Sequence, residues 1–191
     1  MKFVKQCIPD IIVIEPSLHG DTRGYFMETF RQDLFEAAVG HTVNFVQDNE
    51  SKSSEGVLRG LHFQLAPHAQ SKLVRVIEGS VLDVAVDIRI GSPNFGRYVT
   101  VELTAENNKQ LFIPRGFAHG FVVLSETATF SYKVDNYYSP ESDRGIAFDD
   151  PLLNINWRLS NEQLVLSDKD TKQPNLTQLP ECFNYSTNYY A

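Results

Sequence analysis

The sequence predicts an all-β protein built as a sandwich or a barrel, and three observations support this prediction. Thirteen Phe and eight Tyr residues favour pleated sheets, on which flat side chains pack well. From residue 56 to about residue 138, short runs of alternating apolar and polar residues follow one another, separated by turns that contain glycine. Only one segment has a clear helical pattern. Many short strands with few helices are typical of these two architectures.

Before this region, the chain is predicted to contain a strand, a turn-rich stretch and a helix. The run DIIVIEP (10–16) is a strand that ends at its proline, and HGDTRGYFMETF (19–30) places turn residues before aromatic ones. A helix is predicted over 31–40, because its apolar residues share one helical face and Gly40 stands where a C-terminal cap would lie. The run VNFVQDN (43–49) returns to strand character.

The central region shows period-two alternation clearly. In KLVRVIEGSVLDVAVDIR (72–89), the pair EG separates two alternating runs, as in a hairpin. Strand-like runs RYVTVEL, KQLFIP, HGFVVLS and ATFSYKV continue at short spacing. The remainder is turn-rich and is expected to form loops and short helices. We therefore predict one domain over 1–191, with a barrel core at about 43–138 and both terminal extensions packed on it.

Composition and charge argue against several classes of protein. The net charge of −7 repels a phosphate backbone, so the chain is predicted not to bind nucleic acid. No apolar run approaches the ~20 residues of a membrane span, and the N-terminal run MKFVKQCIPD lacks the apolar core of a signal peptide. Cys7 and Cys182 form neither a disulfide framework nor a CxxC metal pattern. These features predict a soluble protein of the reducing cytoplasm with no membrane partner.

The stretch GVLRGLHFQ (56–64) sets a cation and an imidazole among apolar residues. Period-two alternation places Arg59 on one face of a strand and His62 on the other. His62 is either a hydrogen-bonded structural residue or a general base, since an unperturbed imidazole titrates near ~6.5. A base needs an acid on its other nitrogen. The spacing does not choose among the candidate acids, which are Asp48, Asp83, Asp87, Asp168 and Asp170.

Other polar side chains in strand-like segments have two interpretations each. His119 follows IPRGFA and, taken alone, is better explained as structural. Arg59, if buried in its apolar run, needs an anionic partner, which a ligand phosphate would supply as well as a carboxylate. Tyr132 either satisfies its hydroxyl within the core or acts as a general acid opposite a histidine. No metal site is predicted, because Gln64 stands where a second imidazole would be needed and Gln is a poor transition-metal ligand.

Eight motifs occur in one order along about residues 3–175: GDTRGYFMETF, FVQDN, VLRGLHFQ, KLVRVIEGSVLDVAVDIR, SPNFG, LFIPRGFAHGFVVLS, YKVDNYYSPESDRGI and LSDKD. Together they resemble the dTDP-4-dehydrorhamnose 3,5-epimerase family. The resemblance implies a cupin-like jelly-roll barrel with short peripheral helices, a homodimer, and an isomerase that uses neither a cofactor nor a metal. The implied substrate is dTDP-4-dehydro-6-deoxy-α-D-glucose, inverted at C3 and C5 in dTDP-L-rhamnose biosynthesis.

The motifs also match the family at the reacting centre. The C4 ketone of the implied substrate acidifies the hydrogens on C3 and C5, so one base can remove each in turn and an acid on the opposite face can return a proton. By resemblance, His62 is that base, Asp170 is its partner and Tyr132 is the acid. Lys72 matches the cation near the C4 oxygen, where it would stabilise the developing enolate.

Nine further residues match ligand-holding positions of the family. Arg23 and Glu28 match a segment near the nucleotide that a partner subunit can supply. Arg59 matches a diphosphate-binding arginine, which would explain its place in an apolar run, and Tyr138 would stack near the thymine. Asp143 occupies a position that is often Glu. The remaining matches are Gln47, Asn49, His119 and Lys169. Departures from the family pattern affect fine substrate choice more than the reaction type; they are Leu65, Phe148 and Arg158.

Two other kinds of function remain as alternatives. A mono-epimerase acting at C3 or C5 only, or a 3,4-ketoisomerase, would act on a related dTDP-4-keto-6-deoxy sugar. Ketoisomerases of similar fold show His-x-His where this chain has HFQ, whereas mono-epimerases share the histidine and the tyrosine. A non-catalytic sugar-nucleotide binding module would keep Arg59 but could lose His62 or Tyr132, and both are present here.

Overall fold

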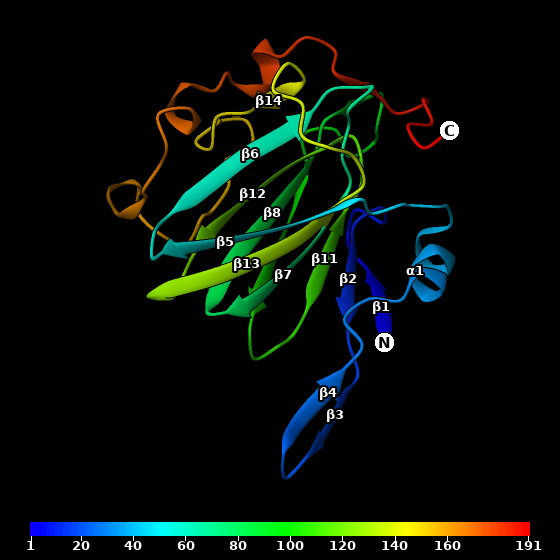
Figure 1. Ribbon diagram of the computed structural model, residues 1–191. Coiled ribbons are helices and arrows are strands. Elements are labelled where there is room, and N and C mark those ends of the chain that lie inside the picture. The colour runs from blue at the N-terminus through cyan, green and yellow to red at the C-terminus, as the bar shows by residue number, and fades with distance from the viewer.

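The computed structural model describes residues 1–191 as two antiparallel sheets that face each other across an apolar core (Figure 1). The six-stranded sheet has the order β1 (Lys2–Lys5), β2 (Ile12–Glu15), β11 (Gln110–Ile113), β7 (Lys72–Glu78), β13 (Thr127–Val134) and β5 (Gln47–Ser54). The five-stranded sheet has the order β10 (Tyr98–Thr104), β8 (Ser80–Asp87), β12 (Phe117–Val123), β6 (Leu58–Gln64) and β14 (Asp143–Gly145). The all-β prediction is confirmed.

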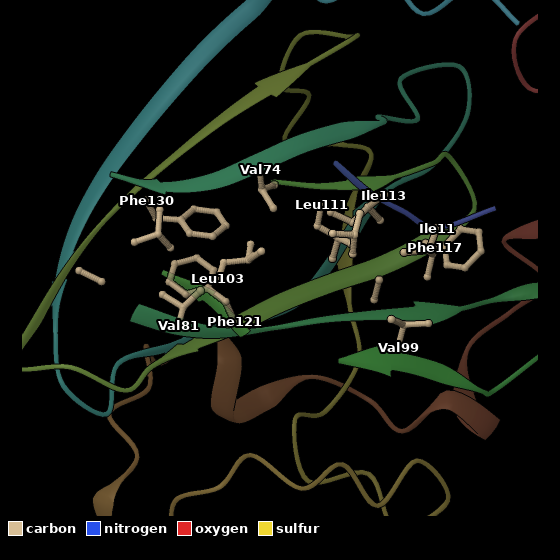
Figure 2. Packing of buried hydrophobic residues seen from close by; sticks show 14 of the residues in the cluster. Ile11, Val74, Val81, Val99, Leu103, Leu111, Ile113, Phe117, Phe121 and Phe130 are labelled. Atoms are coloured by element: carbon tan, nitrogen blue, oxygen red, sulfur yellow. The ribbon is translucent and has the colours of Figure 1, made fainter. Parts of the chain in front are cut away.

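The apolar core between the sheets explains the alternation of the strands. In β8, Val81 and Ala85 point toward the six-stranded sheet, whereas Val84 points to the outer face. Phe121 of β12 and Phe130 of β13 stack across the sandwich with ring centroids 4.1 Å apart (Figure 2). Each inward residue therefore removes apolar surface from water against the opposite sheet, which is the main stabilising contribution in such a fold.

The outer faces of both sheets are covered in part. Helix α1 (Gln32–Val39) packs Phe35 against Phe112 of the six-stranded sheet, with ring centroids 5.0 Å apart. The predicted helix is confirmed, and Gly40 caps its C-terminus at φ 83°. The C-terminal segment covers the five-stranded sheet through apolar residues such as Trp157 and Leu176. It contains three single 3₁₀ turns, η1 (Asn161–Gln163), η2 (Asp170–Lys172) and η3 (Leu176–Gln178).

The strand predicted at 43–49 begins later than expected. Residues 43–46 have no regular secondary structure, and β5 runs from Gln47 to Ser54 with the polar sequence QDNESKSS. The strand pairs only with β13, so it forms one edge of its sheet. Backbone hydrogen bonds to β13 hold the strand in place, so it forms without an alternation of apolar and polar residues in its sequence.

Several elements lie outside the range 43–138. Strands β1, β2 and β14 extend the two sheets beyond it, and β9 (Arg89–Ile90) pairs in parallel with β15 (Phe183–Asn184). Strands β3 (Leu18–Asp21) and β4 (Gly24–Met27) form a hairpin that projects from the body of the molecule (Figure 1). None of the helices has the length and hydropathy that crossing a membrane requires.

Candidate active site

A cavity of about 400 Å³ lies between the two sheets and is bordered by the C-terminal segment. The five-stranded sheet contributes Arg59, His62 and His119 to its lining. The six-stranded sheet contributes Lys72 and Tyr132. Residues far apart in the sequence thus meet in one space, with polar groups from both sheets directed at it.

Arg59 and His62 stand on the same wall of the cavity, although strict alternation predicted opposite faces. Arg59 and His62 are three residues apart on β6, whereas their partners on β12, Phe121 and His119, are only two residues apart. The extra residue is a β-bulge, which shifts the alternation by one position. Gly60 lies within it at φ 133°, where an added Cβ would come within 2.5 Å of the Cα atom of Gly120. Only glycine fits there, and the bulge brings the cation and the imidazole together.

The structure places Asp170, among the five candidate acids, against His62. His62 Nε2 lies 2.5 Å from Asp170 Oδ1, and Ser167 Oγ donates to Asp170 Oδ2 at 2.8 Å. Burial alone would raise the pKa of Asp170, but the hydrogen bond and charge of His62, together with Ser167, hold that pKa below its ordinary value. An ionised carboxylate keeps a proton on Nε2 and leaves Nδ1 as the acceptor. Asp168, by contrast, is exposed.

A second histidine–carboxylate pair lies in the same space. His119 Nε2 is 3.0 Å from both carboxylate oxygens of Asp83, and both residues are buried. Burial lowers the pKa of His119 and raises that of Asp83, against the attraction between the two groups. Lys72 approaches from the other sheet, and burial lowers its pKa to about 8 although Asp83 and Asp143 act in the opposite direction. Lys72 therefore remains mostly protonated at neutral pH but holds its proton weakly.

Tyr132 faces His62 across the cavity. It is half-buried on β13, and burial raises the pKa of its hydroxyl although Arg59 acts to lower it. The phenol therefore keeps its proton at neutral pH and can donate it. Because β13 and β6 belong to different sheets, a molecule held between them would meet the imidazole on one side and the phenol on the other.

Comparison with known proteins gives the family. The family model described as dTDP-4-dehydrorhamnose 3,5-epimerase matches residues 5–178 of the chain. The chain belongs to this family. It is 58% identical over 170 residues to a dTDP-4-dehydrorhamnose 3,5-epimerase of Shigella flexneri, in an alignment that covers 89% of this chain and 93% of the relative. The protein is therefore an isomerase, namely an epimerase.

Solved structures are similar to the epimerase over almost its whole length. A dTDP-6-deoxy-D-glucose-3,5-epimerase from Legionella pneumophila, solved with dTDP-4-keto-L-rhamnose, has a TM-score of 0.93 and 47% identity, and covers 97% of this chain and 99% of its own. A dTDP-4-dehydrorhamnose 3,5-epimerase from Elizabethkingia anophelis has a TM-score of 0.90 and 52% identity, with 93% and 97% covered. The cupin-like jelly-roll fold implied by the sequence resemblance is confirmed.

Three of the residues expected to hold the ligand form a cluster near the His62–Asp170 pair. Asp143 Oδ2 accepts a hydrogen bond from the Tyr138 hydroxyl at 2.9 Å and pairs with the Lys169 ammonium. The hydrogen bond to Asp143 raises the pKa of Tyr138, so the phenol stays protonated. Tyr138 is 60% exposed, which leaves its ring face open for stacking. Lys169 precedes Asp170 in the chain, so the cluster lies beside the carboxylate that contacts His62.

Arg59 is exposed, so the need of a buried arginine for an anionic partner does not arise here. Its Nε and Nη2 atoms lie 3.3 and 3.2 Å from Ser53 Oγ, and it forms no ion pair with a carboxylate. Alternation and the bulge place it at the cavity, where its charge is available to an anionic ligand. On β5 of the six-stranded sheet, Gln47 Nε2 donates to Asn49 Oδ1 at 2.7 Å, and neither residue lines the cavity.

Arg23 and Glu28 lie outside the cavity of their own chain. Arg23 is at the exposed tip of the β3–β4 hairpin and pairs with Asp21. Glu28 follows β4 and is 3.9 Å from Arg31. A position on this projecting hairpin is consistent with a contribution to another copy, but within one chain the two residues contact no other predicted site residue.

Some residues of the site were not found from the sequence. Ser167 supports Asp170, and Ser53 holds Arg59, but small hydroxyl residues in polar stretches give no signal of this kind. Asp83 was considered as a partner for His62 and instead binds His119. Gln64 has a structural role: its amide donates to two backbone oxygens and its Oε1 accepts from the amide of Ser139 at 2.7 Å. No group of three His, Cys, Asp or Glu side chains is arranged to hold a metal ion.

Proposed function

We propose that the epimerase converts dTDP-4-dehydro-6-deoxy-α-D-glucose to dTDP-4-dehydro-β-L-rhamnose by inverting C3 and C5, with His62, Asp170, Tyr132 and Lys72 as its catalytic residues. The observation that supports this most strongly is that a histidine–aspartate pair and a protonated phenol enter one cavity from opposite sheets. Inversion requires removal of a proton from one face of a carbon and delivery to the other, and this arrangement supplies both groups.

In the first half of each inversion, His62 Nδ1 takes the proton from the carbon next to the ketone. The electron pair of the broken C–H bond moves to the C4 oxygen and forms an enolate. Asp170 stabilises the imidazolium that results, and Lys72 stabilises the enolate oxygen by charge and hydrogen bonding. By analogy with the loss of one oxyanion donor, the Lys72 contact contributes about 3–4 kcal/mol to the transition state.

In the second half, the enolate collapses and the carbon takes a proton from Tyr132 on the opposite face. His62 then loses its proton to solvent and Tyr132 regains one, so the protein returns to its starting state. The same two groups act at C3 and at C5, because both carbons flank the C4 ketone. All proton transfers use side chains of the protein, and the proposal includes no cofactor.

The remaining polar residues are proposed to hold the dTDP part of the substrate. The exposed guanidinium of Arg59 binds the diphosphate, the open ring of Tyr138 stacks on the thymine, and Asp143, Lys169, Gln47, Asn49 and His119 provide polar contacts. Arg23 and Glu28 complete the site of a second copy, so the proposed functional form is a homodimer. The exposed aromatic residues of the hairpin support this, since Tyr25 and Phe26 are 62% and 66% exposed.

Proton exchange in D₂O tests the reaction directly. The wild type is expected to incorporate deuterium at both C3 and C5 of the sugar, as followed by NMR with a reductase to trap the product. The variant His62→Ala is expected to lose exchange at both carbons while still binding dTDP, because the base is absent but the nucleotide contacts remain. His68→Ala is the matched control, since His68 is exposed and lies outside the cavity.

The same spectra separate the alternatives. Exchange at one carbon only would identify a mono-epimerase, and a product with its ketone moved to C3 would identify a ketoisomerase. Unchanged exchange in His62→Ala would refute the assignment of the base. Binding of dTDP without exchange in the wild type would favour a non-catalytic binding module.

Mixing two inactive variants tests the dimer. Arg23→Ala and His62→Ala are each expected to have little activity alone. After the subunits are mixed and exchanged, activity is expected to return to about one quarter of the wild-type value, because about half of the dimers are mixed and each has one intact site. No recovery, with subunit exchange verified by mass spectrometry, would show that the hairpin acts within its own chain or not at all.

A further inference from the structure

The C-terminal tail, residues 183–191, lies beyond the part of the chain that matches the family model. It begins with β15, which pairs with β9, and the amide of Asn184 donates to the Tyr189 hydroxyl at 2.8 Å. The Phe183 and Tyr189 rings pack with centroids 5.0 Å apart. The tail therefore has its own internal contacts, which bring Tyr190 to the edge of the sandwich.

The hydroxyl of Tyr190 binds two residues near the end of the six-stranded sheet. It accepts a hydrogen bond from the backbone amide of Arg115 at 2.9 Å and lies 2.7 Å from the hydroxyl of Ser71. Its ring packs on His41, with centroids 4.0 Å apart, and beneath the Arg115 guanidinium at 5.1 Å. Burial raises the pKa of Tyr190 to about 12, so its proton is retained for a hydrogen bond to Ser71.

These contacts join the ends of three adjacent strands. Ser71 immediately precedes β7, Arg115 follows β11 by two residues, and Asp135 directly follows β13. Asp135 Oδ1 accepts from the Ser71 amide at 2.6 Å, and its Oδ2 accepts from Arg115 Nε at 3.1 Å. One phenol and one carboxylate thus hold β7, β11 and β13 together. We call Ser71, Arg115, Asp135 and Tyr190 the strand-end cluster.

The strand-end cluster adjoins the catalytic residues of the six-stranded sheet. Lys72 follows Ser71 and lies opposite Ile113 on β11 and Val134 on β13. Ser71 is fully buried, so its backbone has little freedom to move independently of the cluster. Neither Ser71 nor Tyr190 lines the cavity, so the cluster can affect the reaction only through the strands that carry Lys72 and Tyr132.

We propose that Tyr190 is a positioning residue of the epimerase, which fixes the ammonium of Lys72 in the cavity by holding the start of β7 against the ends of β11 and β13. The inference rests on the proposed function, because it assigns the enolate contact to Lys72. Placement matters strongly here, since a displacement of about 1 Å at a reacting group can reduce the rate by ~10²-fold. The last residues of the chain thereby contribute to catalysis without touching the substrate.

Two matched variants, each of which removes one tyrosine hydroxyl, test this role. Tyr190→Phe keeps the ring packed on His41 but removes both hydrogen bonds to the sheet. Tyr189→Phe removes a hydroxyl whose one hydrogen bond stays within the tail. We expect Tyr190→Phe to lower kcat by about 10-fold with KM for the dTDP-sugar within about twofold of the wild type, because the enolate contact is loosened and the nucleotide contacts remain. Tyr189→Phe should match the wild type in both.

The titration of Lys72 provides a readout that needs no turnover. Its pKa depends on burial and on the charges of Asp83, Asp143 and Lys169 that face it. In ¹³C NMR of labelled lysine side chains, Tyr190→Phe should raise the pKa of Lys72 above about 8, because looser strand ends admit water. Tyr189→Phe should leave it unchanged.

A tail that acts only on stability gives a different pattern. In that case Tyr190→Phe would lower Tm but leave kcat and the Lys72 titration at their wild-type values, and this result would overturn the proposal. A raised KM with unchanged kcat would overturn it as well. A wild type with no turnover would refute the proposed function, and the Lys72 titration would still decide the positioning role of Tyr190.

Discussion

Replacement of Asp170 by Asn tests the proposed role of His62 and Asp170 as a paired base with the least change in shape. The carboxylate now accepts hydrogen bonds from His62 Nε2 at 2.5 Å and from Ser167 Oγ at 2.8 Å. If the side-chain NH₂ of the Asn faces His62, Nε2 must accept a hydrogen bond from it. The imidazole proton then moves to Nδ1, the nitrogen that is proposed to act as the base. If the NH₂ faces Ser167 instead, the side-chain oxygen of the Asn faces His62. The imidazole tautomer is then kept, but the negative charge beside it is lost.

Both orientations reduce the rate, by different amounts. Loss of a hydrogen bond to a charged group costs about 1.5–3 kcal/mol, which corresponds to a ~10- to ~150-fold lower rate. The wrong tautomer costs more, since the equivalent Asp-to-Asn change in a serine protease triad lowers kcat ~10⁴-fold. We therefore expect kcat of Asp170→Asn to fall by between ~10- and ~10⁴-fold with KM nearly unchanged, because Asp170 is not proposed to contact the nucleotide.

The measurement is deuterium exchange at C3 and C5 together with coupled turnover. Asp168→Asn is the control, because Asp168 is two residues away, exposed, and makes no side-chain contact with His62. Activity of Asp170→Asn within about threefold of the wild type would refute the base assignment, since so small a loss is less than that of one charged hydrogen bond. An equal loss in Asp168→Asn would point to disruption of the segment rather than to the pair.

Two further predictions concern the bulge and the buried cation. Gly60→Ala should lower the free energy of unfolding by about 2 kcal/mol or more in urea titrations, because its Cβ would lie 2.5 Å from Gly120 Cα. Gly91→Ala, also at positive φ but with no atom within 4 Å, should cost less, and equal losses would contradict the steric argument. Burial lowers the pKa of Lys72 from 10.5 to about 8, so the folded protein binds this proton less tightly than the unfolded chain. Its ammonium therefore destabilises the fold below pH 8, and the penalty disappears as the pH rises through 10.5. Lys72→Met should abolish turnover yet raise the free energy of unfolding at pH 7 more than at pH 10; an equal gain at both would contradict the linkage.

The sequence predicts the strands best where both the period and the apolar content are clear. The run 72–89 gives β7 and β8 separated at Gly79, as the alternation indicated. Strand β5 is the counter-example, because its residues are mainly polar and its place depends on pairing with β13. An edge strand can be held by backbone hydrogen bonds to its one neighbour without burying an apolar face. A sequence pattern that depends on apolar burial therefore does not detect it.

The residue types of the site were also visible in the sequence, but their spacing did not give their pairing. Spacing left five aspartates as equivalent partners for His62, and only the family resemblance named Asp170, which lies 108 positions away along the chain. The bulge in β6 is a second case, since simple alternation separated Arg59 from His62 and one extra residue brought them to the same wall. Both outcomes depend on contacts between distant segments, about which local spacing carries no information.

By itself, the sequence determined that this protein is all-β, where most of its strands lie, and, through its ordered motifs, the family to which it belongs. Local propensity and period-two burial are properties of neighbouring residues, so they can be read along the chain. Only the tertiary structure decided that His62 and Tyr132 enter one cavity from different sheets, that one extra residue in β6 brings Arg59 to the wall of His62, and that Tyr190 binds the strand ends beside Lys72. These relations depend on how two sheets pack and on where a bulge shifts the register, and that packing is set by the whole chain at once.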